Sequence, residues 1–182
     1  ICSLHKILLD NVRGEENAGC LKTCQNAIGK RLDDKIEDAI FIPCPPERVE
    51  ELMEGLQKYL TQENAEAKVV QCALAHHQFE TIHPFSDGNG RIGRLLIVLH
   101  MIKLGLLSAP LIYPSVFFEQ TRNDYCTRLQ AVRDEDDWEG WISYFAFATT
   151  KACEDTLRFT RTIINLQRHL HSQVADIRRR AS

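Results

Sequence analysis

The chain has 182 residues, a length typical of one domain, and 44% of them are hydrophobic, which is enough to fill a packed core. Its formal net charge is −3, whereas a domain that coats nucleic acid is usually basic, so we expect no nucleic-acid partner for the core. No apolar run approaches the ~20 residues of a membrane span, and the sequence shows no signal peptide. The seven cysteines form no Cys-x-x-Cys pair, which favours reduced thiols and a cytoplasmic location.

The hydrophobic pattern predicts an all-α domain, because apolar residues recur at helical spacing along most of the chain. An opening helix carries Leu4, Ile7 and Leu8, and a later one begins at Pro46, a favoured first residue of a helix. A third helix is expected from about Gly88 to Leu104. Its predicted core face is Ile92, Leu95, Leu96, Leu99 and Ile102. The remaining predicted helices cover about residues 69–77, 119–133 and 137–180.

Residues 38–46, Asp-Ala-Ile-Phe-Ile-Pro-Cys-Pro-Pro, interrupt this helical pattern. Three consecutive bulky apolar residues run into a proline cluster, and proline cannot sit inside a paired β-ladder. The segment therefore predicts a short extended piece with an open edge, in one small β-hairpin or flap beside the helices.

Residues 83–94, His-Pro-Phe-Ser-Asp-Gly-Asn-Gly-Arg-Ile-Gly-Arg, combine side chains suited to phosphate chemistry. Gly88 and Gly90 flank Asn89 where the third helix begins, so backbone N–H groups can approach an anion at a positively polarised helix end. Arg91 and Arg94 are three residues apart and share a helix face. Two guanidinium groups there suit a polyphosphate better than a single carboxylate.

Two further residues of this stretch supply the groups that a transfer reaction needs. Asp87 offers an oxygen ligand, and Mg²⁺ is often held by one or two carboxylates together with phosphate oxygens. His83 precedes it on the same loop, and a neutral histidine can accept a hydroxyl proton near pH 7. Base, metal ligand, anion hole and arginines together indicate phosphoryl or nucleotidyl transfer.

The same stretch resembles the Fic-family signature His-Pro-Phe-x-[Asp/Glu]-Gly-Asn-Gly-Arg-x-x-Arg at every specified position. The similarity extends to residues 75–82, 41–46 and 137–142, and covers roughly residues 1–150. It implies a Fic-type helical bundle with a β-hairpin flap at about 36–44 over an active-site loop and helix start at 83–94. Residues 151–182 would form a C-terminal helical extension or a link to a further domain.

The resemblance also implies an activity, the transfer of AMP from ATP to a Ser, Thr or Tyr hydroxyl of a target protein, with release of pyrophosphate. His83 would be the catalytic base, Asp87 would hold Mg²⁺, and the nucleotide would contact Gly88, Asn89, Gly90, Arg91, Arg94 and Tyr125. The target would dock by strand addition to the flap residues Ala39, Ile40, Phe41 and Ile42.

Some positions depart from the family pattern. Residues 18–22, Ala-Gly-Cys-Leu-Lys, replace the frequent Pro-Gly-x-x-Arg, and Cys126 follows Tyr125 where a second tyrosine is common. Gly90 stands where phosphate-transferring relatives have lysine, which favours AMP transfer. The family's inhibitory motif, [Ser/Thr]-x-x-x-Glu-[Gly/Asn], is not found, so such a helix is expected outside this chain or from a partner.

Three other functions remain open from the sequence. One is removal of AMP by the same site, and another is a nucleotide-sensing module without catalysis. The third is a metal-dependent hydrolase with Glu80 as its base. Its ligands would be His76, His77, His83 and Asp87, although this arrangement gives Arg91 and Arg94 no role.

Overall fold

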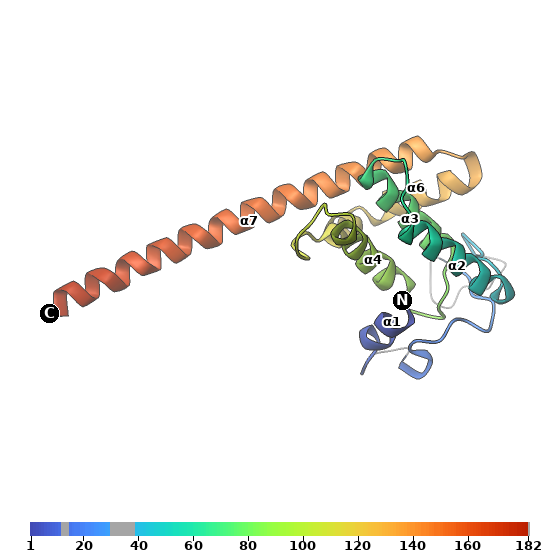
Figure 1. Cartoon of the computed structure of the whole chain (residues 1–182), viewed down its shortest axis with the longest axis horizontal. Coiled ribbons are helices and arrows are strands. Elements are labelled where there is room, and N and C mark those ends of the chain that lie inside the picture. Colours follow the sequence, from blue (N-terminus) through green and yellow to red (C-terminus); the bar gives the residue numbers. More distant parts are fainter. Residues whose placement is uncertain (12–14, 30–38, 182) are drawn as a thin grey trace.

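A computed structural model describes residues 1–11, 15–29 and 39–181, and within these ranges the chain is helical, without an extended strand. The predicted all-α class is confirmed (Figure 1). The elements are α1 (Cys2–Leu8), η1 (Glu15–Asn17), α2 (Pro46–Thr61), α3 (Lys68–Ile82), α4 (Asn89–Lys103), α5 (Pro114–Gln120), α6 (Arg122–Glu135) and α7 (Trp138–Ala181). None of the described helices combines the length and apolarity that a membrane crossing requires.

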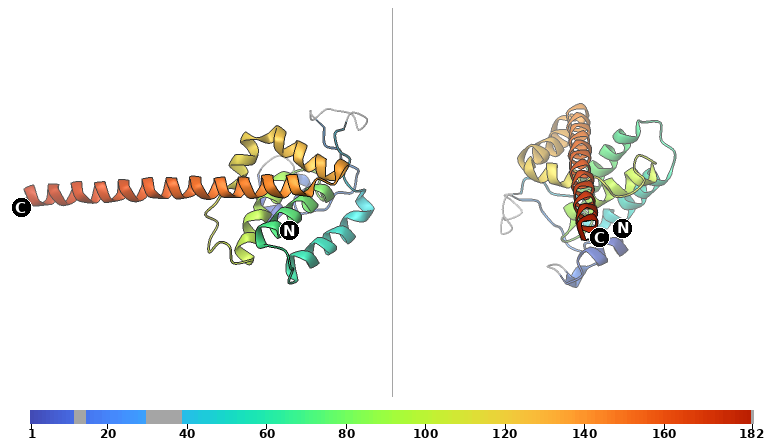
Figure 2. Two further views of the ribbon diagram at one scale, coloured as in Figure 1. Left: turned by 90° about the horizontal axis from the view of Figure 1, so that it is seen from above. Right: turned by 90° about the vertical axis from the view of Figure 1, so that its left-hand side faces the viewer.

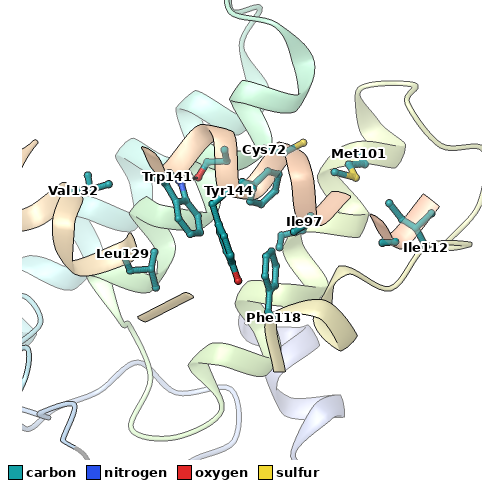
Figure 3. Close-up of a cluster of buried hydrophobic side chains, with 13 residues drawn as sticks. Cys72, Ile97, Met101, Ile112, Phe118, Leu129, Val132, Trp141 and Tyr144 are labelled. Atoms are coloured by element: carbon teal, nitrogen blue, oxygen red, sulfur yellow. Dashed lines mark hydrogen bonds between the residues drawn. The ribbon is translucent and has the colours of Figure 1, made fainter. Parts of the chain in front are cut away.

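The core consists of two clusters of buried side chains. The larger one gathers residues of α3, α4, α5, α6 and α7 around Trp141, whose indole N–H donates to the carbonyl of Ala73 at 3.0 Å (Figure 3). The smaller one joins α2, α3 and α4 beneath the loop between α3 and α4, and includes Phe79, Ile82 and Phe85, each at most 1% exposed. The loop that carries the motif is therefore anchored in the core at Phe85.

The predicted core face of α4 is only partly correct. Leu99 is 38% exposed, whereas Ile97, Val98 and Met101 are buried. Ile97 and Met101 belong to the larger cluster and Ile92 to the smaller one, so α4 is covered on two sides. A single apolar stripe cannot be read from a helix that contributes to two clusters.

Two other helix predictions need correction. The stretch expected as one helix at 119–133 is divided into α5 and α6 at Thr121, whose hydroxyl bonds to the carbonyl of Phe117 at 2.8 Å and to the hydroxyl of Tyr144 at 2.7 Å. In α1, Ile7 is 74% exposed and His5 is buried instead, because His5 faces the motif loop.

The last helix, α7, continues without a break past the body of the molecule as a straight rod (Figures 1 and 2). Its first turns pack against α3, α5 and α6. The hydroxyl of Thr156 donates to the carbonyl of Leu111 at 3.1 Å, and the described side chains beyond that point are exposed.

The predicted flap is only partly visible. Ile28 and Phe41 form one isolated antiparallel bridge, with the N–H of Ile28 donating to the carbonyl of Phe41 at 2.9 Å. Residues 36–38 of the predicted flap lie outside the described residues. The described part thus contains a pairing of two segments and no complete β-hairpin.

Candidate active site

His83 follows the last residue of α3 in the left-handed backbone region, with φ 51° and ψ 62°. Its N–H still donates to the carbonyl of Phe79 at 2.9 Å, so the residue caps the helix and turns the chain toward α4. The side chain keeps 19% of its surface exposed, but the Nδ1 atom is buried and has no hydrogen-bond partner among the described residues. A ligand can therefore reach the opposite edge of the ring, which carries Nε2.

The surroundings of His83 keep its ring neutral. Burial lowers the pKa of His83 to about 4, and the positive charges of Lys22 and Arg133 act in the same direction. The backbone of Glu80 and the carboxylate of Asp87 oppose this shift. At pH 7 the ring is thus unprotonated on one nitrogen, as a proton acceptor must be.

Asn89 fixes the loop between α3 and α4 from inside. Its Oδ1 accepts the N–H of Phe85 at 2.9 Å, and its Nδ2 donates to the carbonyl of the same residue at 2.7 Å. The side chain is 2% exposed. We predicted a nucleotide contact for Asn89, and in this structure its side chain is engaged with the loop, leaving its backbone at the helix start.

His5 pins the other side of this loop. Its Nδ1 accepts the N–H of Gly19 at 2.8 Å, which leaves the proton on Nε2 to donate to the carbonyl of Asp87 at 2.9 Å. The ring also stacks on Phe85, with centroids 3.8 Å apart. His5 could not be found from the sequence, because a histidine in an N-terminal helix carries no signal of a contact 82 residues away.

Lys22 and Asn26 hold the loop through its backbone carbonyls. The N–H of Lys22 donates to the carbonyl of Pro84 at 2.8 Å, and its ammonium group contacts the carbonyl of Ile82 at 3.4 Å. Asn26 donates to the carbonyl of Phe85 at 3.0 Å. Lysine in place of the family's arginine therefore still contacts the loop.

Charged side chains flank the N-terminus of α4. Gly88 caps it with φ 78°, and its N–H bonds to Oδ1 of Asp87 at 2.6 Å. The other carboxylate oxygen of Asp87 lies 3.7 Å from Nη2 of Arg91, and both side chains are more than a third exposed. The carboxylate of Asp87 thus already accepts a hydrogen bond from one backbone amide, as expected at a helix N-terminus that attracts anions.

Arg94 lies on the same end of α4 but deeper. Its Nη1 would be 3.1 Å from a Cβ atom at Gly90, so a side chain at that position would make the guanidinium group shift slightly. Its positive charge lowers the pKa of the buried Glu80 carboxyl and of the His76 ring. No hydrogen bond or ion pair joins Arg94 to another side chain within the described ranges.

Asp87 fits a magnesium ligand better than the predicted hydrolase site fits a transition metal. Its carboxylate is 47% exposed beside the helix end, where phosphate oxygens could complete a coordination sphere. No group of three or more His, Cys, Asp or Glu side chains in the described parts of the chain could hold a metal by itself.

His76 and His77 are engaged elsewhere. The ring nitrogens of His76 lie 2.9 Å from the hydroxyl of Tyr125 and 3.0 Å from the carbonyl of Gly93, whereas His77 faces the carbonyl of Leu129 at 3.3 Å. Both rings are buried. The hydrolase arrangement is therefore not assembled. Tyr125, which we predicted to contact the nucleotide, directs its hydroxyl to His76 inside the larger cluster.

The flap segment is fixed to the body through Arg133 of α6. Its guanidinium carbon lies 3.6 Å from the ring centroid of Phe41, and its Nε and Nη2 both approach the hydroxyl of Thr81 at 3.3 Å. Ile40 and Ile42, on either side of Phe41, are 47% and 51% exposed. The flap segment thus has one anchored residue between two exposed ones.

The fold and this loop define a helical domain with a glycine-capped helix end that suits an anion and a neutral histidine on the preceding loop. Consistent with this class, residues 1–101 match the family model described as "Fic/DOC family". This chain belongs to the Fic/DOC family.

Its relatives include proteins named "Protein adenylyltransferase fic-1". The one from Caenorhabditis briggsae is 32% identical over 148 residues, covering 80% of this chain and 26% of the relative. The one from Caenorhabditis elegans is 31% identical over 148 residues, with the same coverage. The chain therefore spans about a quarter of the length of these curated relatives.

Solved structures agree with the fold. A Fic family protein from Desulfovibrio desulfuricans G20 matches with a TM-score of 0.71 and 25% identity, over 87% of this chain and 46% of that one. Fic-1 from C. elegans (residues 134–508) matches with a TM-score of 0.66 and 26% identity, over 88% and 43%.

Proposed function

We propose that this chain transfers AMP from ATP to a hydroxyl side chain of another protein. The proposal rests on three features of residues 83–94: the neutral and partly exposed ring of His83, the N-terminus of α4, and the two arginines in the first turns of that helix. Relatives that match most of this chain are named protein adenylyltransferases, which supports the same reaction.

Each residue of the site has a separate role in the proposed reaction. The neutral ring of His83 accepts the proton of the target hydroxyl through Nε2 while the hydroxyl oxygen bonds to the α-phosphorus. The bond from that phosphorus to the bridging oxygen breaks, and pyrophosphate leaves with the electron pair. The backbone N–H groups at the start of α4, together with Arg91 and Arg94, stabilise the negative charge of the phosphates.

Asp87 would hold Mg²⁺, which supplies positive charge that neutralises the phosphates when it is bound. A single exposed carboxylate beside the phosphate site suits an ion that takes its other ligands from phosphate and water. Gly90 supports AMP transfer rather than phosphate transfer, because the phosphate-transferring members that the motif resembles have lysine at this position. AMP removal by the same site is the alternative direction.

We propose that the target docks by strand addition to the flap residues Ala39–Ile42. The exposed side chains of Ile40 and Ile42, and the pairing of Phe41 with Ile28, support an extended edge at this position.

An inhibitory helix from outside this chain, or from a partner, would have Arg94 as its natural contact. Arg94 makes no ion pair with any residue that the structure describes.

Two further proposals concern the context of the site. The catalytic core extends to about residue 150, and residues 151–182, most of which belong to α7, are an extension that carries no residue of the proposed reaction. A reducing, cytoplasmic location is supported by the seven cysteines, each of which is a free thiol.

The test is labelling of proteins by the purified chain with ATP carrying a radioactive α-phosphate, in the presence of Mg²⁺. We expect AMP-sized adducts on Ser, Thr or Tyr residues of lysate proteins or of the chain itself, identified by mass spectrometry. His83→Ala should abolish the adducts, whereas His169→Ala, at an exposed position on α7, should leave them unchanged. If labelled protein is never detected, and AMP-modified protein loses its AMP instead, removal is the reaction.

A further inference from the structure

Glu80 is a buried carboxyl group without an assigned role beside the proposed base. It lies in the last turn of α3, three residues before His83, and is 6% exposed. Its Oε1 has no hydrogen-bond partner among the described residues, although buried carboxylates are rarely left unpaired. An unpaired, buried acceptor such as Oε1 of Glu80, beside the proposed base, needs a physical explanation.

A second orphan lies next to it. The buried Nδ1 of His83 also has no hydrogen-bond partner within the described ranges, and it is 3.9 Å from Oε2 of Glu80. Nδ1 thus faces the carboxyl group of Glu80 through Oε2, at more than hydrogen-bond distance, and the unpaired oxygen of the same group is Oε1. Catalytic hydrogen bonds are often long in the free enzyme and shorten in the substrate complex.

We propose that Glu80 is a positioning residue for His83, and that its carboxylate accepts the Nδ1–H of the ring. This contact would place the ring proton on Nδ1 and keep Nε2 free to take the proton of the target hydroxyl. As that proton arrives and the ring becomes positively charged, the carboxylate stabilises it. The proposal rests on the function proposed above for His83.

The surroundings of Glu80 leave little room for another arrangement. A Cβ atom at Gly93 would lie 2.2 Å from Oε1, so only glycine lets α4 pass this closely over the carboxyl group. The side chain of Glu80 is therefore held between its own helix, α3, and the neighbouring helix α4, and it is almost completely buried.

The charges that face this pair come from four parts of the chain. Arg94 of α4 and Arg133 of α6 lower the pKa of Glu80, but burial dominates and raises it to about 7. Tyr125 and Cys126 of α6 also interact with Glu80, and Lys22 and Asp87 with His83. Above this pKa the group is the carboxylate that the proposed contact with Nδ1–H requires.

The experiment compares the full chain with Glu80→Gln, which keeps the shape of the side chain and removes its charge. We expect the rate constant of AMP transfer to fall by roughly 10-fold or more, a part of the ~10²–10⁴-fold that general acid–base catalysis contributes. The KM for ATP should stay close to that of the wild type. The acid limb of the pH–rate profile should move to lower pH, because the charged ring loses its carboxylate neighbour.

His100→Gln is the matched control. His100 is also buried, on α4, and its Nε2 is also without a partner among the described residues, but it lies far along the helix from the loop. It should leave the pH–rate profile unchanged. Equal loss of rate and of melting temperature in the two variants, with no shift of the acid limb, would mean that Glu80 is only structural and would overturn the proposal.

A second readout does not depend on the activity. Nitrogen NMR shifts of the His83 ring report which nitrogen carries the proton, and we expect Nδ1 in the wild type and in Glu80→Gln, whose amide oxygen can still accept, but a mixture in Glu80→Met, which has no acceptor. The same ring state in all three proteins would refute the positioning role. If the ring state depends on Glu80 but no AMP is transferred, the function proposed for the site fails and the positioning role stands.

Discussion

At the scale of single residues, the closest approach in the site is between α3 and α4 at Gly93. Gly93→Ala should destabilise the chain, because its Cβ would lie 2.2 Å from Oε1 of Glu80 and 3.1 Å from Cδ1 of Phe79. Overpacking of this kind costs about 1–3 kcal/mol. The measurement is urea unfolding followed by circular dichroism.

Gly55→Ala is the control for this prediction. Gly55 lies inside α2, and a Cβ there would meet nothing within 4 Å. The substitution should stabilise the chain by roughly 0.5–1 kcal/mol, since glycine weakens a helix interior relative to alanine. Equal effects at Gly55 and Gly93 would show that the contact with Glu80 is not made.

The motif residues were predictable individually, but their partners were not. The proximity of Asp87 and Arg91 at the start of α4 was expected from their spacing along residues 83–94. His5 and Lys22 hold the same loop from segments more than 60 residues away, and local spacing carries no information about such contacts. For Asn89, the sequence indicated a polar residue at the helix start but not that its amide faces inward to Phe85.

At the scale of elements, Arg133 links α6 to both the flap segment and the end of α3. Arg133→Met keeps the length of the side chain but removes the stacking charge over Phe41 and the donors to Thr81. We expect the KM for the target protein to rise several-fold while the KM for ATP stays nearly constant, because the nucleotide does not contact the flap in the proposed arrangement.

Arg122→Met provides the comparison, since Arg122 begins the same helix and its residue is exposed. Steady-state kinetics with varied target and fixed ATP, then the reverse, measures both constants. A rise of the KM for ATP alone would contradict the assignment of Arg133 to the flap.

The helices were more predictable than their packing. Pro46 set the start of α2 as expected, and Gly88 set the cap of α4. The break at Thr121 was missed because it depends on a hydrogen bond to Tyr144 in another helix, and the buried face of α4 was misjudged because two clusters share that helix. Contacts between helices, and not the local sequence, therefore determine both the break at Thr121 and the buried face of α4.

At the scale of the whole molecule, histidines whose pKa values are lowered by burial make stability depend on pH. Burial lowers the pKa to about 3 for His76 and to about 4 for His77 and for His83. A lowered pKa in the folded chain stabilises it above the unfolded pKa of about 6.5, and this stabilisation is lost as the pH falls through the folded values. Glu80 acts oppositely, since its raised pKa stabilises the folded chain at low pH and loses this effect as the pH rises through about 7.

Three histidines outweigh one carboxyl group, so the free energy of unfolding should decrease by several kcal/mol from pH 7 to pH 4. Urea unfolding at constant ionic strength measures this decrease. Glu80→Gln should make it steeper, because the opposing group is removed. A stability that does not change between pH 6.5 and pH 4 would mean that the rings already carry protons in the folded chain.

His83 combines a proposed catalytic role with a left-handed backbone conformation that destabilises the folded chain. A side chain in this conformation costs on the order of 1–3 kcal/mol, and only glycine avoids the cost. An inactive His83→Gly chain should therefore tolerate more heat than an equally inactive His83→Ala chain. Selection for stability alone would favour glycine over histidine at this position. The presence of the imidazole therefore indicates a function that compensates for the strained backbone.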